Sequence, residues 1–129
     1  MEPDIRRLID LLDYELKQST RHRRYLSLVM LSFEDGNRKF VDLLRSGLRQ
    51  SDAMSLSENV VVVLMGATAK SEAIRAVSRY GDEFEGRLNV RCSVSSFPDD
   101  GKTPEELLTV LQRRLKKAAG LSRGAVVAQ

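Results

Sequence analysis

Apolar residues in the first part of the chain recur with the period of an α-helix. Leu8 and Leu12 lie on one face of a segment that also carries charged residues, so we predict an amphipathic helix up to about residue 24. Leu11 and Tyr14 widen the apolar face beyond a single stripe. We therefore expect an interaction helix that contacts a protein partner or a second copy through Leu8 and Leu12; packing of the same face on a sheet is the alternative.

Short apolar runs later in the chain have the length and composition of β-strands. The segment 25–33 is almost continuously apolar, as in a strand that is buried on both faces. The run 60–65 is rich in valine, and with 53–56 it predicts a hairpin. Alternation over 88–94 predicts a further strand, which a turn at 97–101 follows.

Helical spacing returns between these strands. A second helix is expected up to about residue 50, after a turn at 34–37, and a third has its apolar face between residues 69 and 77. The last helix has the clearest beginning: Thr103 is an N-cap residue, Pro104 is the first helical residue, and Glu106 completes a capping box. Residues 121–129 are expected to be a frayed tail or a short edge strand.

The order of these elements predicts the fold class. After the first helix it reads βαββαβα, which is typical of an α/β (α+β) sandwich of the ferredoxin-like or palm type, βαββαβ, here with an extra N-terminal helix. We expect an N-terminal amphipathic helix over 1–24, one domain over 25–120 and a tail over 121–129.

Composition narrows the function classes. The 129 residues carry a net charge of only +3 and no Trp, with 5% aromatic residues, so nucleic acid is not an expected partner. Cys92 is the only cysteine, which predicts a reducing compartment, and therefore the cytoplasm. No apolar run exceeds strand length, so we expect no signal peptide and no membrane span.

Four segments resemble the GGDEF domain of bacterial diguanylate cyclases: 14–31, 43–52, 60–66 and 95–108. The most specific of them is Phe97-Pro-Asp-Asp-Gly101 with the Thr-capped helix that follows it. The resemblance implies the GGDEF fold and a place in bacterial cyclic di-GMP signalling. Residues 79–84 also read almost like the signature itself, but they lie between a predicted helix and a predicted strand, so we interpret them as a coincidence.

The resemblance also implies that the catalytic residues have been lost. In active members, an Asp at the end of the first strand and an acidic residue of the hairpin hold the divalent metal ions. Here these positions fall on Ser32 and on a hairpin in which only Glu58 is acidic, and the guanine-binding segment after the first strand is shortened. We therefore expect a degenerate domain that is not an enzyme and has neither a metal nor a cofactor.

Two features of the family have counterparts in this chain. Arg49-Gln-Ser-Asp52 stands where active members carry an Arg-x-x-Asp inhibition site for cyclic di-GMP, a ligand that suits Arg and Asp side chains; a solvated helix end is the alternative. Lys117 stands where the family has a phosphate-contacting Lys. A single basic patch, or merely a solvated helix end, is predicted from Arg21, Arg23, Arg24, Arg113, Arg114, Lys116 and Lys117.

Three functions stay open. The first is a protein-interaction or regulatory module in bacterial signalling, acting through the N-terminal helix. The alternative is a cyclic di-GMP receptor that uses Arg49 and Asp52. Residual nucleotide cyclase activity, which would depend on Glu58, comes last.

Overall fold

The computed structural model describes residues 3–33, 38–50, 52–83, 90–121 and 126–129, and these ranges hold four helices and five strands. The helices are α1 (Pro3–His22), α2 (Arg38–Gly47), α3 (Lys70–Glu83) and α4 (Pro104–Ala119). The strands are β1 (Leu26–Ser32), β2 (Asp52–Ser57), β3 (Val60–Gly66), β4 (Arg91–Phe97) and β5 (Val126–Val127). Within the described ranges, no helix combines the length and the apolar character that crossing a bilayer requires.

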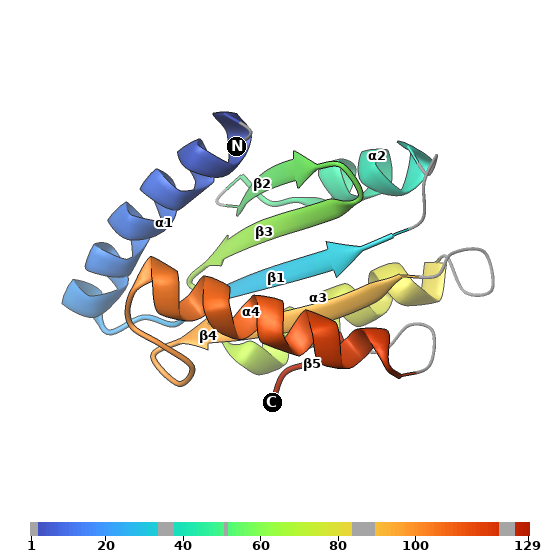
Figure 1. The fold of residues 1–129 in the computed structure, drawn as a ribbon. Helices are drawn as coiled ribbons and strands as arrows, with labels where there is room; N and C mark the ends of the chain where they lie inside the picture. Colours follow the sequence, from blue (N-terminus) through green and yellow to red (C-terminus); the bar gives the residue numbers. More distant parts are fainter. Residues whose placement is uncertain (1–2, 34–37, 51, 84–89, 122–125) are drawn as a thin grey trace.

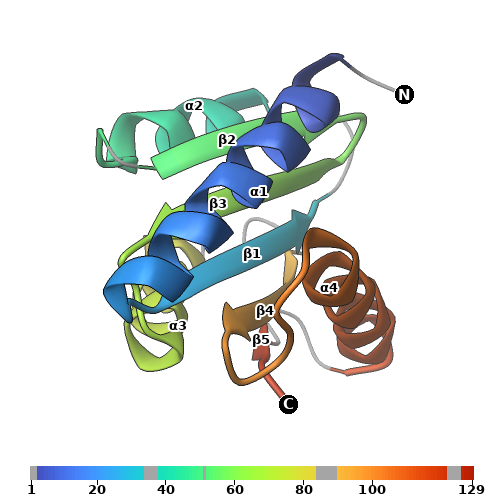
Figure 2. The ribbon, with the colours of Figure 1, turned by 90° about the vertical axis from the view of Figure 1, so that its left-hand side faces the viewer.

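The strands form one sheet in the order β2-β3-β1-β4-β5 (Figure 1). The central strand β1 is antiparallel to both of its neighbours, so that Val29 pairs with Val63 on one side and with Val94 on the other. The short β5 runs parallel to β4, which places an edge strand within the predicted tail. The predicted α/β sandwich is confirmed, because helices cover both faces of this sheet (Figure 2).

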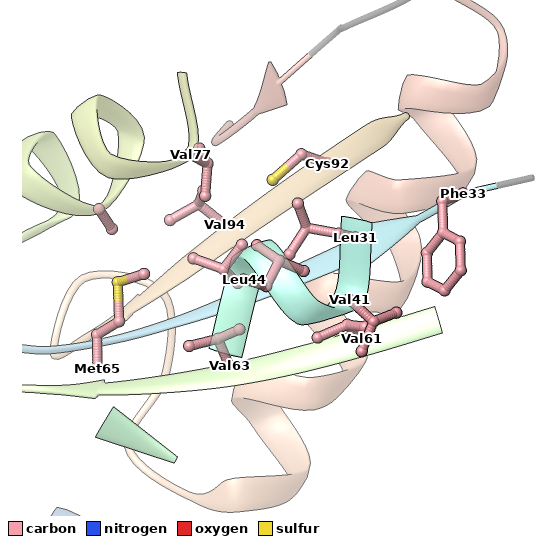
Figure 3. Packing of buried hydrophobic residues seen from close by; sticks show 12 residues of the cluster. Leu31, Phe33, Val41, Leu44, Val61, Val63, Met65, Val77, Cys92 and Val94 are labelled. Carbon is pink, nitrogen blue, oxygen red and sulfur yellow. The ribbon is translucent and has the colours of Figure 1, made fainter. Parts of the chain in front are cut away.

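Alternate residues of β1 belong to two separate hydrophobic clusters, because successive side chains of a strand point to opposite faces. Leu31 lies on the face towards α2 and α3, in one cluster with Leu44 and Val77 (Figure 3). Val29, two residues earlier in the strand, belongs to the same cluster. On the other face, α1 and α4 cover a cluster that includes Leu8, Leu12, Leu28, Leu64, Leu107 and Leu111. Burial on both faces explains why β1 is apolar almost throughout.

Leu8 and Leu12 are inside this second cluster, with 3% and 0% of their surface exposed. The prediction that these two side chains contact a partner is therefore wrong for the folded chain, and the alternative of packing on the sheet holds. The helix can bury only one face against the sheet, and the stripe that contains Leu8 and Leu12 is that face. Leu11 and Tyr14 lie on the outer side and are 40% and 57% exposed.

The sequence predicts the fourth strand over 88–94, whereas β4 spans Arg91–Phe97, so it ends three residues later; residues 88 and 89 lie outside the described residues. It ends at Phe97, within the predicted turn, and it holds the polar residues Ser93 and Ser95 on a buried face. Their hydroxyls donate hydrogen bonds of 2.9 Å and 3.0 Å to the carbonyl oxygens of Leu111 and Leu107 in α4. Because each buried hydroxyl has a partner, these serines fit a buried strand that their polarity alone does not predict.

The beginning of α4 agrees with the predicted cap. The Glu106 backbone N–H donates to Oγ1 of Thr103 at 3.1 Å, and Pro104 is the first helical residue. The carboxylate of Glu106 accepts from the backbone N–H of Lys102 at 3.0 Å, one residue before the donor of a standard capping box.

Candidate functional site

The end of β1 borders a cavity of about 760 Å³ between β1, β4 and the second half of α4. Ser32, which occupies the expected metal-binding position of the strand, is one of its lining residues. We call this space the strand-end cavity; it is lined by Met30, Ser32, Arg91, Thr109, Gln112, Arg113, Leu115, Lys116 and Ala119.

The described lining of the strand-end cavity is positively charged. Among the described residues of this lining, three side chains are cations, namely Arg91, Arg113 and Lys116, and none is a carboxylate. Glu58 does not line this cavity and is exposed, with a positive φ of 53°, at the turn between β2 and β3. This turn lies at the same end of the sheet, because the Phe33 N–H donates to the carbonyl oxygen of Asn59 at 3.0 Å. Magnesium requires hard oxygen ligands, carboxylates above all, and the fixed positive charges repel a divalent cation.

Lys117 and the other basic residues do not come together as one patch. Lys117 is exposed on α4 and does not line the strand-end cavity, whereas its neighbour Lys116 does. Arg23 and Arg24 line a different hollow, before the first residue of α4, and the nine residue steps from Pro104 to Arg113 correspond to roughly 14 Å along this helix. The prediction of a single patch is therefore wrong.

Arg114 does not belong to a basic surface patch, because its side chain forms an internal ion pair. Its side chain is only 11% exposed and contacts Oδ1 of Asp100 at 2.8 Å. A second guanidinium N–H donates to the carbonyl oxygen of Val94 at 2.7 Å. This residue therefore fastens α4 to β4 and to the turn after it.

The structure brings Arg49 and Asp52 together in an ion pair. Nε and Nη2 of Arg49 donate to the two carboxylate oxygens of Asp52 at 3.3 Å and 2.9 Å. Nη2 also donates to Oγ1 of Thr68 at 2.7 Å and to the carbonyl oxygen of Gly66 at 3.2 Å. The connection before β2 is thereby joined to the connection after β3.

The two residues have different roles in this arrangement. The hydrogen bond to Asp52 raises the pKa of Arg49 further above its usual value, so the guanidinium stays charged. The Asp52 side chain is 5% exposed and fully engaged, whereas the Arg49 side chain is 54% exposed. The Asp52 carboxylate thus orients the Arg49 guanidinium, which is the more accessible of the two groups. Contact of either side chain with a ligand stays a prediction.

Arg49 and Asp52 line a hollow of about 240 Å³. Two further arginines, absent from our sequence-based candidates, line it as well. Arg75 and Arg79 stand one turn apart on the exposed face of α3. Their i, i+4 spacing is a signal in the sequence, but it does not say that α3 lies beside Arg49. We call this space the Arg49 hollow; its lining also includes Gly47, Asp52, Met65, Thr68, Glu72 and Ala76.

The near copy of the signature at residues 79–84 is no hairpin in the described part of the chain. Residues 79–83 are the last residues of α3, and residue 84 lies outside the described residues. The interpretation as a coincidence therefore holds for the five residues that the structure describes.

Comparison with known proteins gives a consistent result at the level of structure. No protein-family model matches the sequence, and no protein with a curated description matches it. The GGDEF domain of YfiN (TpbB) from Pseudomonas aeruginosa superposes with a TM-score of 0.85 at 18% identity, over 94% of this chain and 86% of that one.

Two further solved structures have the same fold. The diguanylate cyclase SiaD from Pseudomonas aeruginosa, crystallised with its activator SiaC, has a TM-score of 0.82 at 17% identity, over 96% of this chain and 57% of that one. A microbial GGDEF domain studied with cyclic di-GMP has a TM-score of 0.78 at 12% identity, over 93% and 86%. The element order, the sheet and these superpositions together establish that the chain has the fold of a GGDEF domain.

Proposed function

We infer that this chain is a non-catalytic GGDEF-fold module that regulates a bacterial signalling system by binding cyclic di-GMP. The observation that carries the proposal is the Arg49 hollow, where a half-exposed guanidinium is held in place beside two more arginines. A solved neighbour of the same fold was studied with this dinucleotide.

The residues at the end of β1 support the non-catalytic part. Cyclase chemistry on GTP requires metal ions to neutralise the triphosphate, and a Ser hydroxyl at residue 32 is a poor ligand for them. Glu58 is the acidic residue that the hairpin offers, and it does not line the strand-end cavity. The positive side chains of Arg91, Arg113 and Lys116 work against metal binding there.

The Arg49 hollow suits the chemistry of cyclic di-GMP. A guanidinium group donates paired N–H groups to a phosphate or to the acceptor edge of guanine. Asp52, Thr68 and Gly66 hold Arg49 in one orientation, so little side-chain entropy is lost when a ligand binds. Arg75 and Arg79 have no ion-pair partner among the described residues. Together with Arg49 they outnumber the two carboxylates of the lining, Asp52 and Glu72, so the described lining has a net positive charge.

We predict that cyclic di-GMP raises the melting temperature of the purified chain and that Arg79→Gln weakens this effect. A ligand that binds only the native state stabilises it in proportion to its concentration over Kd. Loss of one charged contact to the ligand is expected to raise Kd about tenfold. Calorimetric titration measures Kd directly, with Arg7→Gln on α1 as the matched control for a lost surface charge.

Arg49→Gln provides the second variant, although it also removes the bonds to Asp52 and Thr68 and lowers stability by itself. The quantity to compare is therefore the difference in melting temperature with and without ligand for each variant. Absence of a shift in the wild-type chain, or an equal loss of affinity in Arg7→Gln, would refute binding at this hollow.

We further predict that the chain forms no cyclic di-GMP from GTP and Mg²⁺. The reason is the absence of a carboxylate at residue 32 and along the described lining of the strand-end cavity. Chromatography of the nucleotides after prolonged incubation tests this. Product that appears in the wild-type chain and disappears in Glu58→Ala would show residual catalysis and overturn the non-catalytic assignment.

The outer face of α1 favours a protein partner as a second candidate. Leu11 and Tyr14 stand three residues apart on one side of the helix and are 40% and 57% exposed. SiaD, a solved neighbour, was crystallised with a protein activator. A partner would contact these two side chains in place of the buried Leu8 and Leu12.

A further inference from the structure

A third hollow, of about 390 Å³, lies between the end of α1 and the connection from β4 to α4. None of its lining residues lines the strand-end cavity or the Arg49 hollow. We call it the Tyr25 hollow; it is lined by Ser19, Thr20, Arg23, Arg24, Tyr25, Phe97, Pro98 and Lys102.

The first wall of the Tyr25 hollow is the end of α1. Arg23 has a φ of 54°, in the left-handed region that favours glycine, and it follows the last helical residue directly. The backbone N–H of Arg24 then donates to the carbonyl oxygen of Ser19 at 2.9 Å and closes the helix. This reversal sets the direction in which the chain passes from α1 into β1 and places Arg23, Arg24 and Tyr25 at the hollow.

The opposite wall is held by β4 and the turn after it. Leu26 and Phe97 are paired across the sheet, which brings Tyr25 close to Pro98. Asp100 accepts from the backbone N–H of Ser96 at 2.8 Å and so closes the turn. The Lys102 backbone N–H is fixed on Glu106 at 3.0 Å, which leaves the Lys102 side chain at the rim.

All charged side chains among the described lining of this hollow are positive. Arg23, Arg24 and Lys102 contribute three positive charges, and no carboxylate stands among the described residues that line the hollow. None of the three side chains forms an ion pair within the part of the chain that the structure describes. Like charges close together repel one another unless a counter-charge is bound, so this arrangement favours an anion.

An aromatic side chain stands beside these cations. Tyr25 is 54% exposed, although it directly precedes the buried residue Leu26, and the buried Phe97 and the ring of Pro98 complete an apolar side. An exposed aromatic ring next to fixed cations offers a planar ligand both stacking and charge neutralisation. The volume lies within the range of small-molecule sites.

We propose that the Tyr25 hollow binds a small anion that carries an aromatic ring, namely a nucleoside phosphate. The base stacks on Tyr25, and the phosphate lies among Arg23, Arg24 and Lys102. An acidic peptide would satisfy the charges but would leave the exposed ring of Tyr25 without a stacking partner, so the observations favour the nucleotide. The site differs from the Arg49 hollow, and either one can be present without the other.

Calorimetric titration with four probes tests the two halves of this recognition. AMP and GMP are expected to bind saturably, whereas adenosine, which lacks the charge, and ribose 5-phosphate, which lacks the ring, bind at least about tenfold more weakly. If ribose 5-phosphate binds as well as AMP, the ring makes no contribution and the proposal is wrong.

Matched pairs of variants test whether these probes bind at the Tyr25 hollow. Tyr25→Leu is expected to weaken AMP binding at least about tenfold and to leave ribose 5-phosphate unchanged, while Tyr14→Leu changes neither. Arg24→Gln is expected to weaken both probes, while Arg21→Gln, which is exposed but outside the hollow, leaves them as in the wild type. Circular dichroism checks that each variant folds.

Three results would overturn the proposal. One is the absence of saturable heat with AMP and GMP at millimolar concentration. Another is an equal loss of affinity in Tyr14→Leu and Tyr25→Leu. The third is binding of a polyglutamate peptide by a chain that binds neither nucleotide, which would assign the hollow to a polypeptide partner instead.

Discussion

Replacement of Asp100 by alanine is expected to lower the free energy of unfolding by about 3–5 kcal/mol. The carboxylate is 8% exposed and contacts Nη2 of Arg114 at 2.8 Å and Nζ of Lys70 at 3.0 Å. Its loss leaves the Arg114 guanidinium, 11% exposed, in the protein without its counter-charge. It also removes the acceptor for the backbone N–H of Ser96. Urea unfolding at neutral pH measures the change.

Asp99→Ala is the matched control, because Asp99 precedes Asp100 in the same turn and is exposed. A change within about 0.5 kcal/mol is expected there. If the two variants lose the same stability, the ion pairs of Asp100 do not hold the turn to α3 and α4, and this account of the fold is incorrect.

The same carboxylate makes stability depend on pH. Desolvation by burial raises the pKa of Asp100, but the hydrogen bonds from Arg114, Lys70 and the Ser96 backbone outweigh it and lower the pKa to about 2. Because the folded-state pKa is below that of the unfolded chain, the contribution is present above about pH 4 and is lost as the pH falls towards 2. It amounts to about 2 kcal/mol. In Asp100→Ala this part of the acid sensitivity should be missing.

Leu12→Ala is expected to lower the free energy of unfolding by about 2–5 kcal/mol, whereas Leu11→Ala changes it by about 0.5 kcal/mol or less. Leu12 is fully buried between α1 and the sheet, in the same cluster as Leu28 and Leu107, and Leu11 is 40% exposed on the neighbouring position of the same helix. Truncation of Leu12 removes apolar contact and leaves a cavity, while Leu11 loses little. Denaturant unfolding of the two variants compares them directly.

An aspartate at residue 11 or residue 12 distinguishes an effect on folding from an effect on association with a partner. Leu12→Asp places an unpaired carboxylate in the core and is expected to unfold the chain. Leu11→Asp should remain folded, and any self-association or partner binding through the outer face of α1 should weaken in this variant alone. A folded Leu12→Asp chain with reduced association would instead restore the surface that the sequence predicts at Leu8 and Leu12.

Arg49 and Asp52 illustrate how far a short motif can be interpreted. The spacing singles out both residues, and the structure joins them in one turn, in which the Asp52 N–H donates to the Arg49 carbonyl oxygen at 3.0 Å. The ion pair between the two side chains is not among the sequence-based expectations. The motif does not predict that the guanidinium of Arg49 also donates hydrogen bonds to Thr68 and Gly66, or that the Asp52 side chain is buried. Gly66 lies 17 residues and Thr68 lies 19 residues after Arg49, so a pattern of a few neighbouring residues does not reveal these hydrogen bonds.

The sequence by itself determined the type and order of the elements, and with them the α/β sandwich. Helical spacing, the valine-rich run of β3 and the cap at Thr103 are local signals, and the backbone obeys them because hydrogen bonding and side-chain alternation act over a few residues. The near-continuous apolar run of β1 likewise predicts its burial on both faces.

Only the tertiary structure decided which apolar residues are buried and which charged residues form ion pairs. It buried Leu12 and exposed Leu11, paired Arg114 with Asp100, and supplied carbonyl partners from α4 to the serines of β4. It also divided the basic residues among three separate hollows. Each of these outcomes depends on a partner far away in the chain, because burial and pairing are properties of the packed layers and not of the local sequence.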